Sequence, residues 1–474
     1  MSPKKTERVE RVRFPQPYLK TRVPAGRGAS EQPNATSDGE TLLSPRFWIF
    51  LILTGVGAGL FGDLMMFLLF TVEHFAYHYN SGNFLTAVGK TSALHRIAML
   101  ALAGVVGGIA WYVLNKYTKG QKSEVDDVVW ERSGELGPPK SIGTSIIQEV
   151  VIGLGASIGR EAAPKLLGAL SGSLLGKWAK LNPSQRRLLV ACGAGSGLAA
   201  VYNVPLGGAI FTAEVMLGEL SLPIVLPAIA CSVIATTVGY LYLPNHATYP
   251  GVPNYSFRLS EVLFAIVAGP LIGLFSVAFV RLIGFISHHR LRGRATLIGP
   301  LLAFLILGII ATKYYQLLGN GKDMAQTVIT NHLSTLTLLA ALMLLKPLVT
   351  LLSLGGGASG GLFTPALSIG AVLGGFLGGV WTLIVPGSPV GAYAMIGAAA
   401  MMGASLQAPL SALVLVFELT QSGLGIVVPM IIATVIATAV SRRVDGYSIY
   451  SARLSMEEVT TSLDPTSDPP SSEH

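Results

Sequence analysis

Long apolar segments limit what this chain can fold into more than any other feature of its sequence. Seven of them lie at about 47–72, 94–115, 222–243, 259–287, 295–318, 333–354 and 424–440. A helix of about 20 apolar residues crosses a hydrocarbon core about 30 Å thick, so each segment is long enough to span a bilayer. The pattern predicts an all-α polytopic membrane protein.

The composition excludes the main soluble classes. Of the 474 residues, 51% are hydrophobic and only 12% are charged, whereas about 25% of the residues in an average globular protein are charged. A soluble enzyme of this length would need far more polar surface, and a disordered protein would show the opposite balance.

Shorter stretches rich in glycine and alanine separate the long segments. They lie at about 142–157, 162–178, 188–202, 205–218, 361–381, 391–403 and 408–421. Several are too short, or too interrupted by Gly and Pro, to cross a bilayer alone. Broken or re-entrant helices are tolerated at membrane depth only where protein or a water-filled cavity surrounds them. This indicates a transporter or a channel rather than a bundle of uniform helices.

The second part of the chain repeats the first. The stretch CGAGSGLAAVYNVPLGGAIFTAEV begins at Cys192, and IGAAAMMGASLQAPLSALVLVFEL begins at Ile396. A constant offset of 204 aligns Gly193 with Gly397, Ala200 with Ala404, Pro205 with Pro409, Leu206 with Leu410 and Glu214 with Glu418. We therefore divide the membrane part into two homologous repeats, 46–240 and 258–442.

Loop charge predicts how the repeats lie in the membrane. The loops around 116–122, 288–294 and 442–443 are basic, whereas the loop 241–257 contains no Lys or Arg. Positive loops stay in the cytoplasm, so both termini are predicted there and the loop between the repeats outside. The second repeat is then inverted relative to the first. Inverted repeats put a substrate site near the bilayer midplane, between discontinuous helices.

The polar ends are expected to be tails. Residues 1–47 contain nine Lys/Arg and five Asp/Glu. We interpret 1–45 as a disordered basic cytoplasmic tail that obeys the positive-inside rule, in preference to a nucleic-acid-binding segment. A second disordered tail is predicted over 458–474. The two cysteines share no short spacing with each other or with histidine, so no metal site is expected.

A charged pair, Arg160 and Glu161, interrupts the apolar sequence in GASIGREAAP. Charge at membrane depth is costly and by default indicates function, although a pair that only ties loops together is the alternative. Gly159 precedes a new helix, whose free N–H groups and positive dipole end favour an anion. Glu161 lies in that first turn. Its carboxylate is therefore able to occupy the anion's own place, and protonation or movement would clear it.

The second repeat carries a matching segment, GGGASGGLFTP, which starts at Gly355. Gly361, Leu362 and Phe363 would open the next helix, which gives a second helix start facing an anion. A phosphate-binding loop is disfavoured because no GxxxxGK[ST] is present. Glycine packing alone remains the simpler alternative.

These segments resemble the CLC family of chloride channels and chloride/proton antiporters. GREAAP is similar to the family motif GREGP, GGLFTP is similar to GxFxP, and SRRVDGYSIYSARL resembles the closing segment with the pore tyrosine. The resemblance covers about residues 45–455. It implies an inverted-repeat bundle of the prokaryotic type without cytoplasmic regulatory domains, and a homodimer with one pore in each subunit.

The resemblance also implies roles for residues. Glu161 matches the gating glutamate, and the backbone N–H groups of Leu362 and Phe363 match those that hold the central anion. Tyr450 matches the tyrosine whose hydroxyl contacts that anion, with Tyr447 as a weaker candidate, on a short cytoplasmic helix at 443–457. The flanking anion-binding residues are Gly159, Arg160 and Gly361.

Two departures from the family pattern affect the function. The central serine position aligns with Gly120 in the stretch Lys119–Ser123, which puts selectivity among anions in doubt. At the inner proton site, Glu214 takes the first position of a Glu-Glu-Met segment and Val215 takes the second. A proton path through Glu214 stays open, but the loss of the second carboxylate favours an uncoupled channel. The match with Glu418 favours a structural role, in which both glutamates bond helix ends.

We therefore expect a voltage-gated CLC-type chloride channel in a plasma membrane, most simply the bacterial inner membrane. A chloride/proton antiporter and a fluoride exporter of the same fold are the alternatives. An enzyme is not expected, and the metalloprotease motif H-E-x-x-H is absent. The expected partners are chloride, the lipid bilayer and a second copy of the chain, bound through the faces 205–218 and 408–421. No cofactor and no nucleic acid are expected.

Overall fold

The computed structural model describes residues 43–79, 82–130, 135–291, 293–333, 335–385 and 387–453, apart from the side chains of Asp127 and Trp130. Residues 1–42 of the tail predicted over 1–45 lie outside the described residues. The whole of the tail predicted over 458–474 also lies outside them.

The all-α prediction is confirmed over the described residues. In the first half the helices are α1 Pro45–Tyr77, α2 Phe84–Lys90, α3 Ala93–Tyr117, α4 Val125–Trp130, α5 Pro138–Gly153, α6 Ala162–Trp178, α7 Pro183–Tyr202, α8 Pro205–Phe211 with a π-helical continuation Thr212–Leu217, and α9 Leu222–Gly239. In the second half they are α10 Leu259–His288, α11 Gly299–Ala311, α12 Lys322–Ile329, α13 Leu336–Gly355, α14 Phe363–Thr382, α15 Val390–Leu406, α16 Pro409–Thr420 and α17 Val427–Val444. Within the described ranges, eight helices are long and apolar enough to cross a membrane.

The structure differs from the predicted segments in a few places. The segment 295–318 is divided, because 3₁₀ turns flank α11 on both sides. The short helices α2, α4 and α12 were not predicted, because six to eight residues are too few to give a periodic apolar signal. The prediction of a short helix over 443–457 is also wrong over its described part, which ends at residue 453. Here α17 ends at Val444, Gly446 has a φ of +77°, and a 3₁₀ turn at Ser451–Arg453 follows Tyr450.

Both repeats break their helices in the same way. In the first, α7 ends at Tyr202, Asn203 has a φ of 55°, and α8 starts at Pro205. In the second, α15 ends before Gln407, which has a φ of 58°, and α16 starts at Pro409. A left-handed residue ends a helix, and a proline without an N–H suits the first helical position of the next. The offset of 204 therefore repeats a local structure as well as a sequence.

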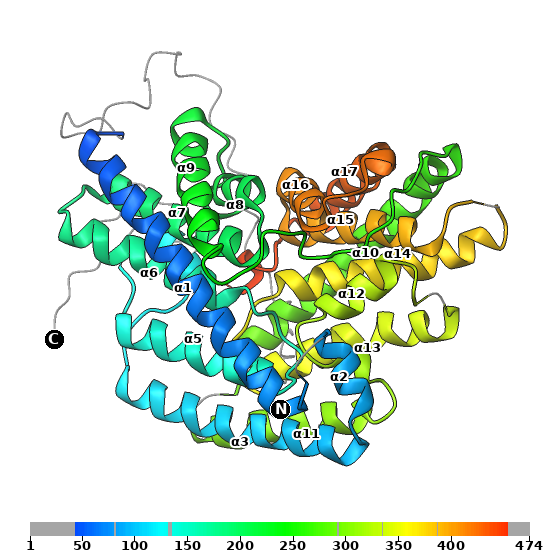
Figure 1. The fold of residues 1–474 in the computed structure, drawn as a ribbon, viewed down its shortest axis with the longest axis horizontal. Helices are drawn as coiled ribbons and strands as arrows, with labels where there is room; N and C mark the ends of the chain where they lie inside the picture. The colour runs from blue at the N-terminus through cyan, green and yellow to red at the C-terminus, as the bar shows by residue number, and fades with distance from the viewer. Residues whose placement is uncertain are drawn as a thin grey trace, which may run out of the picture.

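Glycines pack the corresponding helix pairs. A Cβ atom on Gly168 of α6 would overlap the carbonyl of Gly193 of α7, and a Cβ on Gly370 of α14 would overlap that of Gly397 of α15. Small residues let helix backbones approach this closely in a membrane protein. In Figure 1, α6 and α7 lie on one side of the molecule and α14 and α15 on the other, while α8 and α16 face each other between them.

The two long breaks, between α5 and α6 and between α13 and α14, meet inside the bundle. Gly159 and Gly361 form the one bridge between extended residues in the part of the chain that the structure describes. The inverted repeat thus brings two helix starts, those of α6 and α14, to one place.

Candidate functional site

The breaks are joined by paired backbone hydrogen bonds. Gly159 N donates to Gly361 O at 2.8 Å, and Gly361 N donates to Gly159 O at 2.9 Å. A Cβ atom on either glycine would overlap the carboxylate of Glu161. The Glu161 side chain therefore fills the space beside both glycines of the bridge.

The Glu161 side chain crosses from its own repeat to the N-terminus of α14. Its Oε1 accepts from Phe363 N at 2.7 Å and from Thr364 N at 3.3 Å, and its Oε2 accepts from Thr364 Oγ1 at 2.9 Å. The residue is only 3% exposed. The first N–H groups of a 20-residue helix have no intrahelical partner and carry its positive dipole end, so this is an anion site. A carboxylate of the protein occupies it.

Tyr202 extends this hydrogen-bond network from the end of α7. Its hydroxyl lies 2.7 Å from Thr364 Oγ1 and 3.5 Å from Glu161 Oε2. Since Thr364 gives its one hydroxyl proton to Glu161, the Tyr202 hydroxyl donates to Thr364. The carboxylate is thus held by two backbone donors and by a chain of two hydroxyls.

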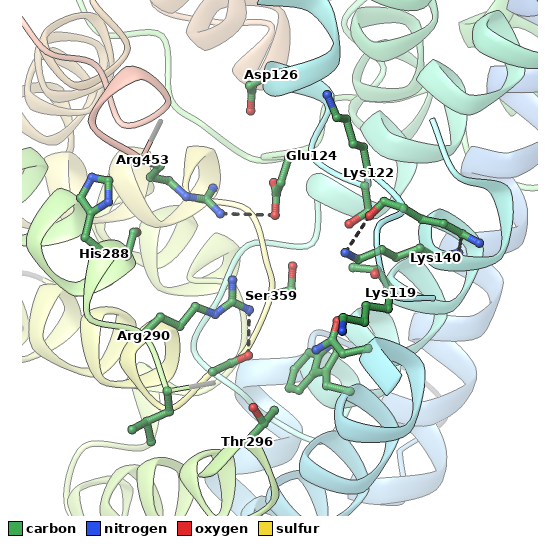
Figure 2. A pocket seen from close by; sticks show the side chains of 18 of the residues that line it. Lys119, Lys122, Glu124, Asp126, Lys140, His288, Arg290, Thr296, Ser359 and Arg453 are labelled. Atoms are coloured by element: carbon green, nitrogen blue, oxygen red, sulfur yellow. Dashed lines mark hydrogen bonds and ion pairs between the residues drawn. The ribbon is translucent and has the colours of Figure 1, made fainter. Parts of the chain in front are cut away.

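Two connected cavities lead to Glu161 from one side. A narrow cavity of about 40 Å³ is lined by Glu161, Lys165, Ser359, Leu362 and Tyr450, among others. It shares Ser359 and Tyr450 with a wide cavity of about 900 Å³, which we call the Tyr450 vestibule (Figure 2). Tyr450 therefore lies where the wide cavity narrows toward Glu161.

Cationic side chains outnumber acidic ones around the Tyr450 vestibule. Figure 2 shows the five cations Lys119, Lys122, Lys140, Arg290 and Arg453 against the two acids Glu124 and Asp126. Arg453 lies 3.8 Å from Glu124, whereas Arg290 and Lys140 bond backbone carbonyls. A cleft lined by one sign of charge concentrates ions of the opposite sign, so this vestibule attracts anions.

Lys165 brings a cation into the narrow cavity itself. Its Nζ lies 3.3 Å from Asp126 Oδ2 and 4.5 Å from the centre of the Tyr450 ring. The residue is 8% exposed, in the first turn of α6. Glu161, Lys165 and Tyr450 line the cavity together, so an anion there would meet a cation, a helix N-terminus and a phenol.

A different cavity is lined by Arg160, the residue before Glu161. It has a volume of about 280 Å³, and its lining includes Phe70, Glu73, Arg160, Lys322 and Asp323; we call it the Glu73 cavity. The Arg160 guanidinium lies over the rings of Phe70 and Tyr202, at 5.7 and 5.2 Å. The adjacent residues Glu161 and Arg160 therefore line different cavities.

The structure brings most of the predicted site residues together. Gly159, Arg160, Glu161, Gly361, Leu362, Phe363 and Tyr450 all lie at the two breaks or in the cavities beside them. The expectation named the N–H groups of Leu362 and Phe363, whereas in the structure the N–H groups of Phe363 and Thr364 donate to the Glu161 carboxylate.

Gly120 is not brought to this place. It lies in the turn after α3 with a φ of +83°, and it is not among the residues that line the narrow cavity or the Tyr450 vestibule. Ser123 lines both. A serine three residues after Gly120 therefore contributes to the lining of both cavities.

Sequence reasoning missed four side chains of the site: Tyr202, Thr364, Lys165 and Asp126. Thr364 stood inside the quoted GGLFTP, and Lys165 is a charged residue in an apolar helix next to GREAAP, so both carried a signal. Tyr202 carried no such signal in the sequence, because a tyrosine at a helix end is common. Its role depends on the contact between repeats.

Similarity to known proteins was measured for sequence and for structure. Residues 103–442 match the family model described as "Voltage gated chloride channel". A protein of Escherichia coli O9:H4 (strain HS), named voltage-gated ClC-type chloride channel ClcB, is 30% identical over 392 residues, which are 78% of this chain and 90% of the relative. The protein of the same name from Escherichia coli (strain K12 / DH10B) is 29% identical over the same shares.

Two solved structures share the fold. A slow cyanobacterial Cl⁻/H⁺ antiporter superposes with a TM-score of 0.76 at 22% identity, covering 89% of this chain and 99% of the other. A CLC-type fluoride/proton antiporter superposes with a TM-score of 0.69 at 21% identity, covering 86% of this chain and 97% of the other. The arrangement of broken helices is therefore shared across all three proteins.

Proposed function

The chain belongs to the family of voltage gated chloride channels, and we propose that it conducts chloride through a pore gated by Glu161. The observation that carries this proposal is the place of the Glu161 carboxylate, on the backbone N–H groups of Phe363 and Thr364. Those donors suit any anion. While the carboxylate holds them, a chloride ion has no access to them.

Opening requires Glu161 to leave its donors. A proton on the carboxylate removes the charge that the helix N-terminus stabilises, and the neutral side chain is then free to swing away. Chloride takes over the N–H groups of Phe363 and Thr364, and the Thr364 hydroxyl turns its proton to the ion. The gate therefore works by competition between two anions for one set of donors.

The Tyr450 vestibule supplies chloride to the gate. Its excess of cations raises the local concentration of anions, and Lys165 continues the positive potential into the narrow cavity. The Tyr450 hydroxyl offers a donor at the narrowing. Under the orientation predicted from loop charge, this vestibule faces the cytoplasm, the Glu73 cavity faces outside, and the membrane is the bacterial inner membrane.

We propose conduction without proton coupling. Val215 offers no carboxylate at the position where the family's antiporters often carry one, and the Glu214 carboxylate is bonded to Leu410 N, Ser411 N and Ser411 Oγ. A glutamate engaged in this way is poorly suited to passing protons. The proton that neutralises Glu161 would cross part of the membrane field to reach it, which would make opening voltage-dependent, since a full elementary charge gains about 2.3 kcal/mol per 100 mV.

We also propose a homodimer, with α8 and α16 at the interface. Leu206 and Leu410, at corresponding positions of the two repeats, are 51% and 49% exposed in the single chain. Tryptophan at both positions should shift the purified protein from dimer to monomer in light scattering. Tryptophan at Ile266, an equally exposed residue of α10 at 49%, should leave the dimer intact.

The test is ion flux in liposomes that contain the purified protein, with voltage clamped by valinomycin and a pH dye outside. Wild type and Glu161→Gln run side by side, with chloride and with fluoride. We expect chloride flux without proton movement in the wild type, and faster, pH-independent chloride flux in the variant.

Two results would overturn the proposal. Uphill proton movement driven by chloride, abolished in Glu161→Gln, would make the chain an antiporter. Fluoride flux without chloride flux in both proteins would make it a fluoride exporter.

A further inference from the structure

A second glutamate, Glu149, is buried close to the gate and has no role in the pathway described above. It lies on α5, one turn before Gly153 and on the same face. Gly153 packs against Val72 and the Leu69 carbonyl of α1, so Glu149 faces α1 as well. Its exposed fraction is 0%. A carboxyl group therefore lies between two membrane helices, away from solvent.

Neither oxygen of Glu149 has a hydrogen-bond partner among the described residues. By contrast, its neighbour Gln148 uses its amide to bond Gly159 O at 3.2 Å. A charged carboxylate without partners is far more costly to bury than a neutral carboxyl group. The geometry thus favours a Glu149 that carries a proton.

The charges that act on Glu149 are those of the pathway. They are Arg160, Glu161 and Glu73, and the Arg160 guanidinium acts on Glu73 as well as on Glu149. Arg160 and Glu73 both line the Glu73 cavity, and the Nε of Arg160 also has no hydrogen-bond partner among the described residues. Glu149 is thereby linked to the gate on one side and to that cavity on the other.

Other charged groups on the helices around α5 are engaged elsewhere. On α1, Asp63 lies ten residues, nearly three helical turns, before Glu73. On α6, Lys165 is paired with Asp126. On α3, which meets α5 at Gly107, His95 and Arg96 bond the carbonyls of Ala76 and Ala311.

We propose that Glu149 is a proton-binding site that supplies the proton by which Glu161 opens; this rests on the proposed gating by Glu161. The O–H bond of Glu149 breaks, an O–H bond forms on Glu161, and the carboxylate left on Glu149 is stabilised by the Arg160 guanidinium. Glu149 then regains a proton from the Glu73 cavity. A carboxylate on Glu149 also repels a carboxylate on Glu161, so the state in which both glutamates are charged is costly.

The first test measures chloride flux against pH, equal on both sides of the liposome, for wild type, Glu149→Gln and Glu149→Asp. In the wild type we expect flux to rise as pH falls. Glu149→Asp keeps the carboxyl group and should keep this rise. Glu149→Gln should shift the midpoint of the rise in chloride flux by about one pH unit or more, which corresponds to a tenfold change in proton affinity. A Glu149→Gln profile that superposes on the wild type would overturn the proposal.

The second test detects the proton directly and needs no flux. The infrared carbonyl band of a protonated carboxyl group is compared between Glu161→Gln and the double variant Glu149→Gln/Glu161→Gln at neutral pH. We expect Glu161→Gln to show a carbonyl band of a protonated carboxyl group that is absent from the double variant. Identical spectra would show that Glu149 carries no proton and would refute the proposal.

The same variants separate this proposal from the proposed function. If the double variant Glu149→Gln/Glu161→Gln has the same chloride flux as Glu161→Gln, its pore is intact. Any change of flux in Glu149→Gln then acts through the gate. Absence of chloride flux in wild type and in Glu161→Gln would refute chloride conduction, whereas the infrared result would still decide whether Glu149 binds a proton.

Discussion

Glu214 and Glu418 each cap the helix that belongs to the other's repeat. Glu418, near the end of α16, accepts from Leu206 N at 3.1 Å and from Gly207 N at 2.5 Å at the start of α8. Glu214, in the π-helical continuation of α8, accepts from Leu410 N at 3.3 Å and from Ser411 N at 2.6 Å at the start of α16. The two repeats are thus joined by a reciprocal pair of carboxylate caps across their pseudo-twofold axis.

Removal of either cap should destabilise the protein without changing transport chemistry. We expect Glu214→Gln and Glu418→Gln each to cost about 0.5–2 kcal/mol, the usual value of a lost N-cap, and to lower the melting temperature in detergent by similar amounts. Glu219→Gln, an exposed glutamate next to α8, is the matched control. If Glu214→Gln alone altered proton movement at unchanged stability, a proton path through Glu214 would replace the structural interpretation.

The hydroxyl groups of Thr364 and Tyr202 should stabilise the closed position of the Glu161 carboxylate. Thr364→Val removes a donor to the Glu161 carboxylate, and hydrogen bonds to charged groups contribute about 1.5–3 kcal/mol. We expect chloride flux at alkaline pH to rise about tenfold or more, with a smaller rise for Tyr202→Phe, whose hydroxyl acts mainly through Thr364. Thr236→Val in α9, whose hydroxyl has no partner among the described residues, is the control. Unchanged flux in Thr364→Val would show that the backbone donors alone hold the gate.

The bridge glycines should be intolerant of a side chain only because of Glu161. Gly361→Ala places a methyl group on the Glu161 carboxylate, so we expect it to abolish closure at alkaline pH or to lower the yield of folded protein. In a Glu161→Ala background the same substitution should be harmless in both flux and melting temperature. Gly355→Ala, where the added atom meets only Ile286 at 3.3 Å, is the control. Equal damage in both backgrounds would mean that the bridge itself excludes alanine.

Lys165 should contribute to chloride affinity. Its ammonium group lines the narrow cavity beside Tyr450, so Lys165→Met is expected to weaken chloride binding by about fivefold or more in calorimetry, which corresponds to about 1 kcal/mol. Asp126→Asn should strengthen binding, because it frees Lys165 from its acidic partner. Lys177→Met, on the exposed part of the same helix, should leave affinity unchanged. Equal affinity in wild type and Lys165→Met would place the ion away from this cavity.

Much of the fold follows from local patterns in the sequence. The lengths of the apolar segments predicted most of the long helices, and the offset of 204 predicted that the breaks before Pro205 and Pro409 would be alike. A proline that begins a helix and a left-handed residue that ends one act within a few residues, so they can be read without knowing the fold. Glu161 was found in the same way, as a charge at membrane depth next to a helix start.

The tertiary structure alone decided which groups meet. No spacing in the sequence pairs Glu161 with Thr364 and Tyr202, or places Lys165 over Tyr450, because each of these contacts joins segments far apart in the chain. Nor did the alignment that paired Gly120 with the central serine position predict that Ser123, three residues further on, would line the narrow cavity. In the sequence, Glu149 is one polar residue within the stretch 142–157. Only the packing of α5 against α1 makes it a buried acid beside the gate, because burial depends on what the rest of the chain lays over a side chain.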